Sequence, residues 1–461
     1  MTTIAGRIAR TGVVLLAGYL LLALLAVYWQ VVRADELVAD PTANAGRLYQ
    51  EELRVARGRI LDRNGVVLAE TVTAPDGTRQ RRYPHPGTVH VVGYHSARFG
   101  ESGMEAVAGG ILSGRTGVSA LLGIFWDLLH QPRRGGEVRL TLDSRIQQAA
   151  EAAMGGQPGA VVALNPRTGE VLALVSTPGF DPNRLEQQWE TLRTSPARPL
   201  LNRATQGRYS PGSTFKTVTL ATALEAGLVD ALTPIRCPEQ LNVAGFPVRS
   251  RNEPSGKTTR TVRDAYAYSC NTAFAELGLQ VGQERLTALA GALGLGERIP
   301  FELETAAGQV SSTPEYVDSP QGLAVTAFGQ GEVLVTPLHL ALIAAAVAND
   351  GLVPVPRLTA GKLPATWQRA MSPPAARALA EIMEYSVEEG WAAAGAVPGV
   401  RVAGKTGTAE VGERRQPHAV FIAFAPVEAP RIAVAVLKEQ GGAGSTAAGP
   451  VVRAVLQAAL K

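Results

Sequence analysis

Cysteine, lysine and blocks of like charge are all scarce in this sequence. Two cysteines in 461 residues exclude a disulfide-rich scaffold and a zinc site built from four cysteines. The net charge is only +4 and no block of about five or more like charges occurs, so a nucleic-acid-binding surface is not indicated. Hydrophobic residues make up 46%, which excludes a disordered chain and allows a large buried core.

Lysine is rare because arginine carries nearly all of the positive charge. Lysine and arginine together number 44, but the lysines are only Lys216, Lys257, Lys362, Lys405, Lys438 and Lys461. Lysine can lose its proton and arginine cannot. Each lysine is therefore a candidate proton acceptor, and two of the six stand in short motifs.

Long hydrophobic runs are also rare, and one stands out near the N-terminus. Residues 12–29 carry no charge, and the apolar character extends over 11–32, enough for a helix of about 33 Å that could cross a bilayer. Arg7 and Arg10 precede the run and acidic residues follow it, which predicts a cytoplasmic N-terminus, a single-pass anchor and an exported remainder. A signal peptide cleaved near residue 33 is the alternative, although its apolar part is usually shorter.

The order of the predicted elements indicates an α/β (α+β) fold. We expect a helix at 147–154, a hairpin of strands at 159–164 and 170–176, helices at 215–225, 261–281, 286–293, 338–349 and 375–385, strands at 402–408, 419–425 and 432–437, and a last helix at 449–460. A hairpin, then helices, then strands predicts one central antiparallel sheet sandwiched by helices. The preceding segment, up to about residue 145, reads as mixed and rich in loops.

No cofactor and no metal are expected. His85, His90 and His95 are spaced by five residues, which matches neither one face of a helix nor alternate positions of a strand.

The first motif that carries chemistry is Ser213-Thr214-Phe215-Lys216, directly after Ser210-Pro211-Gly212. The Pro-Gly pair ends a loop and predicts a helix start at about Ser213. Positions i and i+3 share a helix face, so the hydroxyl of Ser213 and the amine of Lys216 can meet. A serine hydroxyl is a weak nucleophile until a base takes its proton, and a partly desolvated lysine can be that base.

Two further motifs follow, at Ser269-Cys270-Asn271 and at Lys405-Thr406-Gly407-Thr408. The first lies in a loop or helix break and offers a relay hydroxyl and an amide that can hold a peptide carbonyl. The second begins a predicted strand, in which glycine lets another chain approach the backbone closely. Because Cys270 lies inside the first of these motifs, we expect two buried free thiols at Cys237 and Cys270 rather than the possible disulfide.

The three motifs, in this order and separated by 56 and 136 residues, resemble those of the penicillin-binding proteins. The resemblance extends over nearly the whole chain and is closest to class B, the monofunctional transpeptidases. It includes the anchor, Arg57-Gly58-Arg59-Ile60-Leu61-Asp62-Arg63, the hairpin at 163–170, Asn202-Arg203-Ala204, Gly329-Gln330-Gly331 and Thr336-Pro337. About 110 residues separate the anchor from the catalytic domain, too few for a glycan-polymerising domain.

This resemblance implies a D,D-transpeptidase of cell-wall synthesis that is inhibited by β-lactams. Ser213 would attack the carbonyl of the penultimate D-Ala of a peptidoglycan stem peptide, with Lys216 as the base. Ser269 and Lys405 would pass a proton to the departing D-Ala. An amine from a neighbouring stem would then attack the acyl-enzyme and complete the cross-link.

The resemblance also implies the groups that bind the substrate. Asn271 would orient the donor peptide, while Thr406 and Thr408 would hold its terminal carboxylate beside Gly407. The backbone N–H groups of Ser213 and Thr408 would form the oxyanion hole.

Three other activities remain as alternatives to transpeptidation. A D,D-carboxypeptidase would acylate in the same way and use water as the acceptor. A β-lactamase would need a deacylation motif, E-x-x-L-N, which does not occur between Ser269 and Lys405. A β-lactam-binding sensor or scaffold would signal or recruit, but only about ten residues precede the anchor.

The expected organisation is a cytoplasmic tail at 1–10, a transmembrane anchor at 11–32, a pedestal resembling a dimerisation domain at 33–145, and a transpeptidase domain at 146–461. The resemblance implies a bacterial cell membrane location. It also implies a polytopic glycan polymerase of the shape, elongation, division and sporulation (SEDS) type as the membrane partner.

Overall fold

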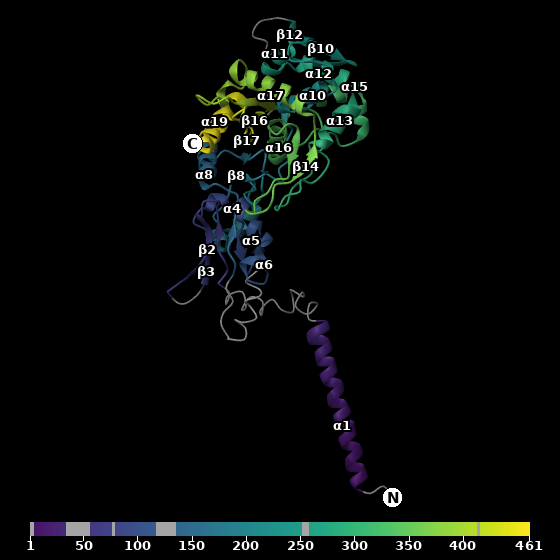
Figure 1. Cartoon of the computed structure of the whole chain (residues 1–461), viewed down its shortest axis with the longest axis vertical. Helices are drawn as coiled ribbons and strands as arrows, with labels where there is room; N and C mark the ends of the chain where they lie inside the picture. Colours follow the sequence, from purple (N-terminus) through teal and green to yellow (C-terminus); the bar gives the residue numbers. More distant parts are fainter. Residues whose placement is uncertain (1–3, 34–55, 76–78, 117–134, 251–257, 413–414) are drawn as a thin grey trace.

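The computed structural model describes residues 4–33, 56–75, 79–116, 135–250, 258–412 and 415–461. Helix α1, Ile4–Val27, continues as a π-helical turn at Tyr28–Val32. Among the described residues, one helical stretch, Gly6–Gln30, is long and apolar enough to cross a membrane, and none of it is buried. Figure 1 shows α1 apart from the folded body, in which a small domain lies below a larger one.

The small domain, or pedestal, is a twisted sheet with short helices. Its strands are β1 Ile60–Leu61, β2 Val67–Thr73, β3 Arg79–Arg82 and β6 Val138–Arg139, in the order β3-β2-β1-β6, with β1 and β6 parallel. The helices are α4 Val89–Val92, α5 Gly103–Val107 and α6 Gly109–Leu112, and β4 His95–Ser96 pairs with β5 Gly100–Glu101. These short elements account for the weak periodicity of this part of the sequence.

Ion pairs stabilise the pedestal, and a hydrogen bond to Asp62 joins the pedestal to the large domain. The buried guanidinium of Arg57 lies 2.7 Å from Glu105 and 2.8 Å from Glu101, so no charge is left buried alone. The carboxylate of Asp62 accepts backbone N–H groups of its own turn and of Ser144 in the large domain. Burial opposes ionisation, but these hydrogen bonds outweigh it and lower the pKa of Asp62.

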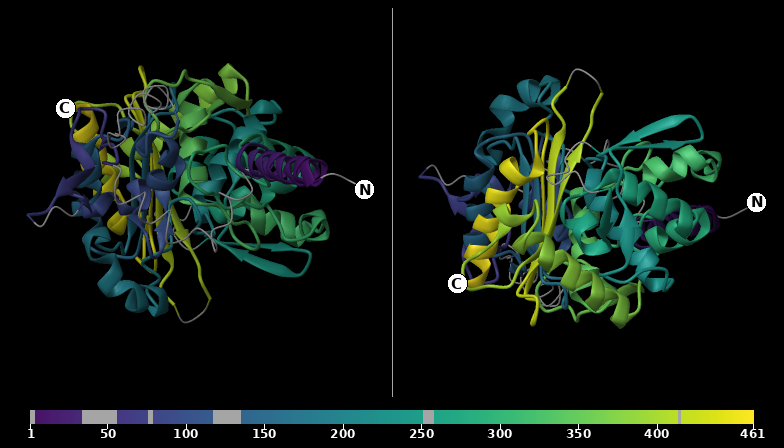
Figure 2. Two further views of the ribbon diagram at one scale, coloured as in Figure 1. Left: turned by 90° about the horizontal axis from the view of Figure 1, so that it is seen from below. Right: turned by 90° about the horizontal axis from the view of Figure 1, so that it is seen from above.

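The large domain is built on one antiparallel sheet in the order β15-β16-β17-β7-β8. The strands are β7 Gly159–Leu164, β8 Val171–Thr177, β15 Ala403–Ala409, β16 His418–Ala425 and β17 Ile432–Lys438. Helices α8 Ser144–Met154 and α19 Gly449–Leu460 cover one face, and α16 Pro337–Ala348 and α17 Pro373–Glu388 cover the other (Figure 2). Because both faces are covered, β7, β16 and β17 are almost continuously apolar. The edge strand β15 is more polar. The expected sheet sandwiched by helices is confirmed.

Capping residues set the starts of the helices that cover the sheet. The side chain of Asp143 accepts the N–H of Arg145 at the start of α8. Thr336 and Ser372 cap α16 and α17 in the same way, each followed by proline at the first helical position.

Most of the remaining helices and three two-stranded sheets form a lobe beside the large sheet. The helices of the lobe are α10 Lys216–Glu225, α11 Val262–Ala267, α12 Asn271–Val281, α13 Gln283–Ala292, α14 Pro314–Asp318 and α15 Pro320–Ala327. Helix α9 Leu185–Thr194 instead contacts the pedestal, and α18 Gly444–Ala447 packs on β15 and β16. The two-stranded sheets pair β9 Pro234–Arg236 with β12 Thr259–Thr261, β10 Gln240–Val243 with β11 Phe246–Arg249, and β13 Leu352–Pro354 with β14 Thr366–Arg369. The sequence analysis missed them because strands of three or four residues are too short to show an alternating pattern.

The two cysteines form a disulfide, so the expectation of two free thiols is wrong. Cys237 follows β9, and the pairing of β9 with β12 brings it beside Cys270 at the start of α12. Their Cα atoms lie 6.2 Å apart, within the usual range for a disulfide. The bond uses only side-chain atoms of Cys270, which leaves the backbone of its motif free for other contacts.

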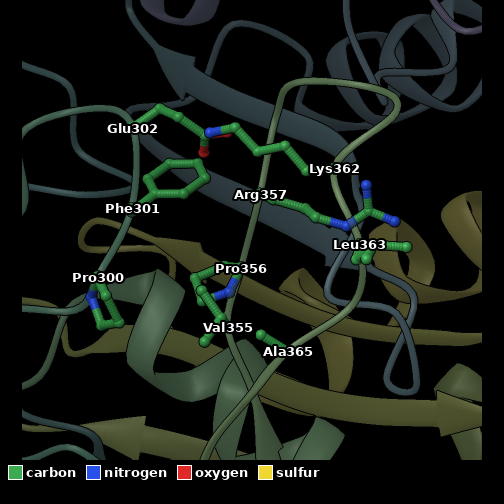
Figure 3. A pocket seen from close by; sticks show the side chains of 9 residues that line it. All are labelled: Pro300, Phe301, Glu302, Val355, Pro356, Arg357, Lys362, Leu363 and Ala365. Carbon is green, nitrogen blue, oxygen red and sulfur yellow. The ribbon is translucent and has the colours of Figure 1, made fainter.

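The large domain has a pocket of about 480 Å³, and Figure 3 shows the side chains that line it. Its lining residues are Pro300, Phe301, Glu302, Val355, Pro356, Arg357, Lys362, Leu363 and Ala365. Glu302 holds one side of it by accepting the N–H groups of Leu358 and Thr359 and pairing with Lys362. None of the lining residues belongs to the three sequence motifs.

Candidate active site

The first motif lies at the junction of a short 3₁₀ helix, Gly212–Phe215, with α10. The α-helix therefore begins three residues after the predicted start at Ser213. In a 3₁₀ turn, residues i and i+3 lie on the same face. The amine of Lys216 consequently lies 3.1 Å from the hydroxyl of Ser213.

Lys216 is fully buried and its Nζ contacts four oxygen atoms. Besides Ser213 Oγ, these are the carbonyl of Ser269 at 2.6 Å, the hydroxyl of Ser269 at 3.0 Å and Oδ1 of Asn271 at 2.7 Å. The centre of the Phe274 ring lies 5.6 Å from the Lys216 amine. Burial, followed by the nearby charge of Lys405, holds the pKa of Lys216 well below its ordinary value. A neutral amine in this place can accept the Ser213 proton.

Lys405 is also fully buried and approaches Ser269 from the opposite side. It lies on β15, and its amine is 3.0 Å from Ser269 Oγ and 3.0 Å from the carbonyl of Thr406. The Tyr266 ring lies 5.5 Å from it. Burial lowers the pKa of Lys405 to about 7. The hydroxyl of Ser269 thus lies between two amines and can relay a proton between them.

Ser269 has an unusual backbone conformation, which follows from the end of α11. Its φ is +61°, in the left-handed region. The N–H of Ser269 donates to the carbonyl of Tyr266, and the N–H of Cys270 donates to the carbonyl of Ala265. This pattern ends helices with a left-handed residue that is usually glycine, and a serine there costs about 1 kcal/mol or more. The loop or helix break expected at this motif is present, so the single helix expected over 261–281 is wrong: α11 and α12 are separate helices.

The third motif lies on the edge strand of the sheet, β15, beside the 3₁₀ helix. Gly407 permits this close packing, because a Cβ on it would lie 3.0 Å from the carbonyl oxygen of Pro211. A Cβ on Gly212 would lie 2.8 Å from the carbonyl oxygen of Thr408. Thr406 is buried and Thr408 is exposed. The start of the Ser213 helix and the backbone of Thr408 therefore lie side by side.

Asn271 completes the cluster at the first turn of α12. Its Oδ1 accepts from Lys216 and its Nδ2 donates to the carbonyl of Arg249. The structure thus joins the side chains of Ser213, Lys216, Ser269, Asn271 and Lys405 in one cluster. The contacts described for Thr406, Gly407 and Thr408 in this region involve their backbone.

Sequence reasoning missed several residues that shape the site. The rings of Tyr266 and Phe274 surround the two amines, and the side chain of Gln330 donates to the carbonyl of Thr408 at 3.3 Å. Gln330 stands in the Gly-Gln-Gly motif, which could have marked it. The two aromatic residues carry no local signal that separates them from the rest of the core.

Comparison with known proteins identifies the family. The model of the penicillin-binding protein transpeptidase domain matches residues 159–457, and that of the penicillin-binding protein A dimerisation domain matches 57–138. Peptidoglycan D,D-transpeptidase PbpA of Mycobacterium tuberculosis is 39% identical, over 98% of each chain. The chain belongs to the class B penicillin-binding proteins. Peptidoglycan D,D-transpeptidase MrdA of Escherichia coli is 30% identical, over 82% of this class B chain and 71% of MrdA.

Solved structures of this family agree with the same assignment. Penicillin-binding protein A of M. tuberculosis, as a ceftriaxone acyl-enzyme complex, superposes with a TM-score of 0.83 at 35% identity, covering 90% of this chain and all of that one. Its penicillin G acyl-enzyme complex gives a TM-score of 0.81 at 36% identity, covering 88% of this chain and 100% of that one. The resemblance stated from the motifs is confirmed.

Proposed function

We propose that this class B penicillin-binding protein is a peptidoglycan D,D-transpeptidase whose nucleophile is Ser213. The observation that carries the proposal is a continuous chain of contacts from Ser213 Oγ through Lys216 Nζ and Ser269 Oγ to Lys405 Nζ. Each neighbouring pair lies at 3.0 or 3.1 Å, within the reach required for proton transfer.

In the acylation step, Lys216 takes the proton of Ser213 as Oγ attacks the carbonyl of the penultimate D-Ala. The tetrahedral oxyanion lies between the backbone N–H groups of Ser213 and Thr408, whose donation strengthens as negative charge develops. Collapse of this intermediate breaks the amide bond and leaves an ester on Ser213. The departing D-Ala amine receives a proton through the hydroxyl of Ser269, which is also in contact with Lys405.

The edge strand β15 and Asn271 hold the donor peptide. Gly407 lets β15 lie close to the start of the Ser213 helix, and Thr406 and Thr408 offer hydroxyls to the terminal carboxylate of the donor peptide. An acceptor amine then attacks the ester and gives a proton to Lys216, which passes it to Ser213 Oγ as the ester bond breaks. The new amide bond is the cross-link. β-Lactams present an amide with the same geometry and acylate Ser213.

The test is labelling of the purified ectodomain with a fluorescent penicillin. The expected result is a stable covalent adduct that Ser213→Ala abolishes. Rapid turnover of the drug would instead indicate a β-lactamase. Release of D-Ala from a stem peptide without cross-linking, even when an acceptor amine is supplied, would favour the D,D-carboxypeptidase.

We further propose that residues 1–10 are cytoplasmic, 11–32 form the anchor, 33–145 form the pedestal and 146–461 form the extracytoplasmic transpeptidase domain. The two family matches fall inside the last two segments, and α1 overlaps the anchor. The location is then the bacterial cell membrane. The partner is a polytopic SEDS-type polymerase that contacts the anchor and pedestal, and purification of the full chain from membranes with its bound proteins tests this.

A further inference from the structure

The peptide that joins Tyr268 to Ser269 has to be held in an unfavourable conformation. Ser269 is left-handed although it is not glycine, and in this conformation its hydroxyl lies between Lys216 and Lys405. On the C-terminal side of this peptide, the disulfide of Cys270 fixes the chain. On the N-terminal side, α11 ends at Ala267, and the N–H groups of Tyr268 and Ser269 donate to the carbonyls of Asp264 and Tyr266.

Trp391, which follows α17, lies against this N-terminal side. Its indole Nε1–H donates to the carbonyl of Tyr268 at 3.1 Å, and its backbone N–H donates to the carbonyl of Ala267 at 3.2 Å. The indole also meets the Tyr268 ring edge to face, with the ring centres 6.3 Å apart. The Tyr268 carbonyl belongs to the same peptide group as the N–H of Ser269, which donates to Tyr266, so the indole holds that peptide from its second polar end.

The Trp391 side chain makes these contacts without being buried, since 41% of the residue is exposed. Partial exposure is ordinary for a tryptophan. Trp391 is linked to the motif by its two hydrogen bonds to the carbonyls of Ala267 and Tyr268.

We propose that Trp391 is a positioning residue for Ser269, acting through the Tyr268 carbonyl to keep the Ser269 hydroxyl between the two lysine amines. The proposal rests on the proposed function, because it concerns the proton relay of the same acylation. It predicts that the indole N–H affects the rate of the chemical step more than the binding of the ligand.

The experiment removes this N–H with the least change in shape. Trp391→Phe keeps an aromatic ring, and replacing Trp391 with 3-benzothienylalanine keeps the size and changes the N–H to sulfur. Acylation of the membrane-extracted full chain by penicillin G is followed by stopped flow, which separates the first-order acylation rate constant from the dissociation constant of the non-covalent complex. Trp189→Phe, on α9, is the matched control, because the Trp189 ring stacks on Phe99 and contacts no motif residue in the described contacts.

We expect the acylation rate constant to fall about three- to tenfold in both Trp391 variants, the effect of one lost hydrogen bond. The dissociation constant and the melting temperature of the benzothienylalanine variant should stay at the wild-type values, and Trp189→Phe should acylate normally. An unchanged rate constant in the benzothienylalanine variant would overturn the proposal. So would a change confined to the dissociation constant, which would make Trp391 a ligand contact. Persistent labelling of Ser213→Ala would count against the proposed function itself.

Discussion

At the scale of single residues, the site depends on two lysines in the same buried space. Burial lowers the pKa of both, and each amine faces an aromatic ring, Phe274 for Lys216 and Tyr266 for Lys405. Nearness of the two amines lowers the pKa of Lys216 further. A proton acceptor is thus made from a side chain that is ordinarily protonated, which explains why arginine cannot take its place.

Lys216→Arg should abolish penicillin labelling although it keeps the positive charge. Arginine cannot accept the proton of Ser213, so we expect labelling to fall to the level of Ser213→Ala. Lys362→Arg is the matched control, because Lys362 is exposed and pairs with Glu302 away from the motifs. Labelling that survived in Lys216→Arg would show that another group is the base.

Lys405 should make stability depend on pH in a definite direction. Its pKa is about 7 in the folded protein and near the ordinary 10.5 when unfolded. Between these values the unfolded chain binds one proton more, so the free energy of unfolding rises with pH, by at most about 1.4 kcal/mol per pH unit. Thermal unfolding of wild type and Lys405→Met at pH 7 and pH 9 measures this. The stability of wild type relative to the variant should increase at pH 9; a decrease would contradict the pKa shift.

At the scale of elements, close backbone packing brings the 3₁₀ helix, β15 and the turn after α15 together. Gly329, in the Gly-Gln-Gly motif, has a φ of +85°, and a Cβ there would lie 1.9 Å from the carbonyl oxygen of Gly212. Ser210 donates to the carbonyl of Gly329 at 2.9 Å. The turn at Gly329 therefore packs directly against the residues that begin the Ser213 helix.

Gly329→Ala should displace the Ser213 helix and slow acylation at least about tenfold, because the new methyl group collides with backbone that cannot rotate away. Gly361→Ala is the matched control, because it introduces a similar backbone strain without a collision. Gly361 has a φ of +84°, and a Cβ there meets nothing within 4 Å. Both variants are compared by acylation rate and by melting temperature. Equal acylation rates would rule out the packing argument.

The disulfide should stabilise the lobe that carries the Ser269 motif. It closes a loop with a sequence separation of 33 residues, for which a loss of about 2–4 kcal/mol is usual on removal. Cys237→Ala, which leaves the motif intact, should lower the melting temperature by about 4–8 °C. Treating the wild-type protein with a reductant should give the same shift, and a reductant should not affect the variant. An unchanged melting temperature in Cys237→Ala would contradict the expected stabilisation.

At the scale of the whole molecule, the anchor and the catalytic domain are separate in the structure. The described part of α1 is fully exposed, whereas the pedestal is joined to the large domain through Asp62 and through the side chain of Asn202, which donates to the carbonyl of His90. The pedestal and the catalytic domain are therefore expected to behave as one body without the helix.

Deletion of residues 1–33 should release the protein from membranes and leave the acylation rate of Ser213 unchanged within about twofold, since no described contact joins α1 to the site. Membrane fractionation and penicillin labelling of the same preparation measure the two effects. The full chain with Ser213→Ala is the complementary control, because it should stay in the membrane fraction without labelling. A truncated protein that remained in the membrane fraction would contradict the assignment of the anchor.

The sequence by itself determined the features that depend on neighbouring residues. Three features of the sequence are local patterns: the three-residue spacing of Ser213 and Lys216, the β-rich runs of the sheet, and the long uncharged run near the N-terminus. The structure shows them as a contact, strands and a helix. The family followed from the three motifs, from their order and from their spacing along the chain.

Only the tertiary structure decided what happens between distant segments. Lys405 lies 136 residues after Ser269, and its hydrogen bond to Ser269 exists because β15 and the break between α11 and α12 pack on the same helix start. The lowered pKa values, the Cys237–Cys270 bond and the position of Trp391 have the same origin. Burial and approach are properties of the packed chain, so no local pattern of residue types could specify them.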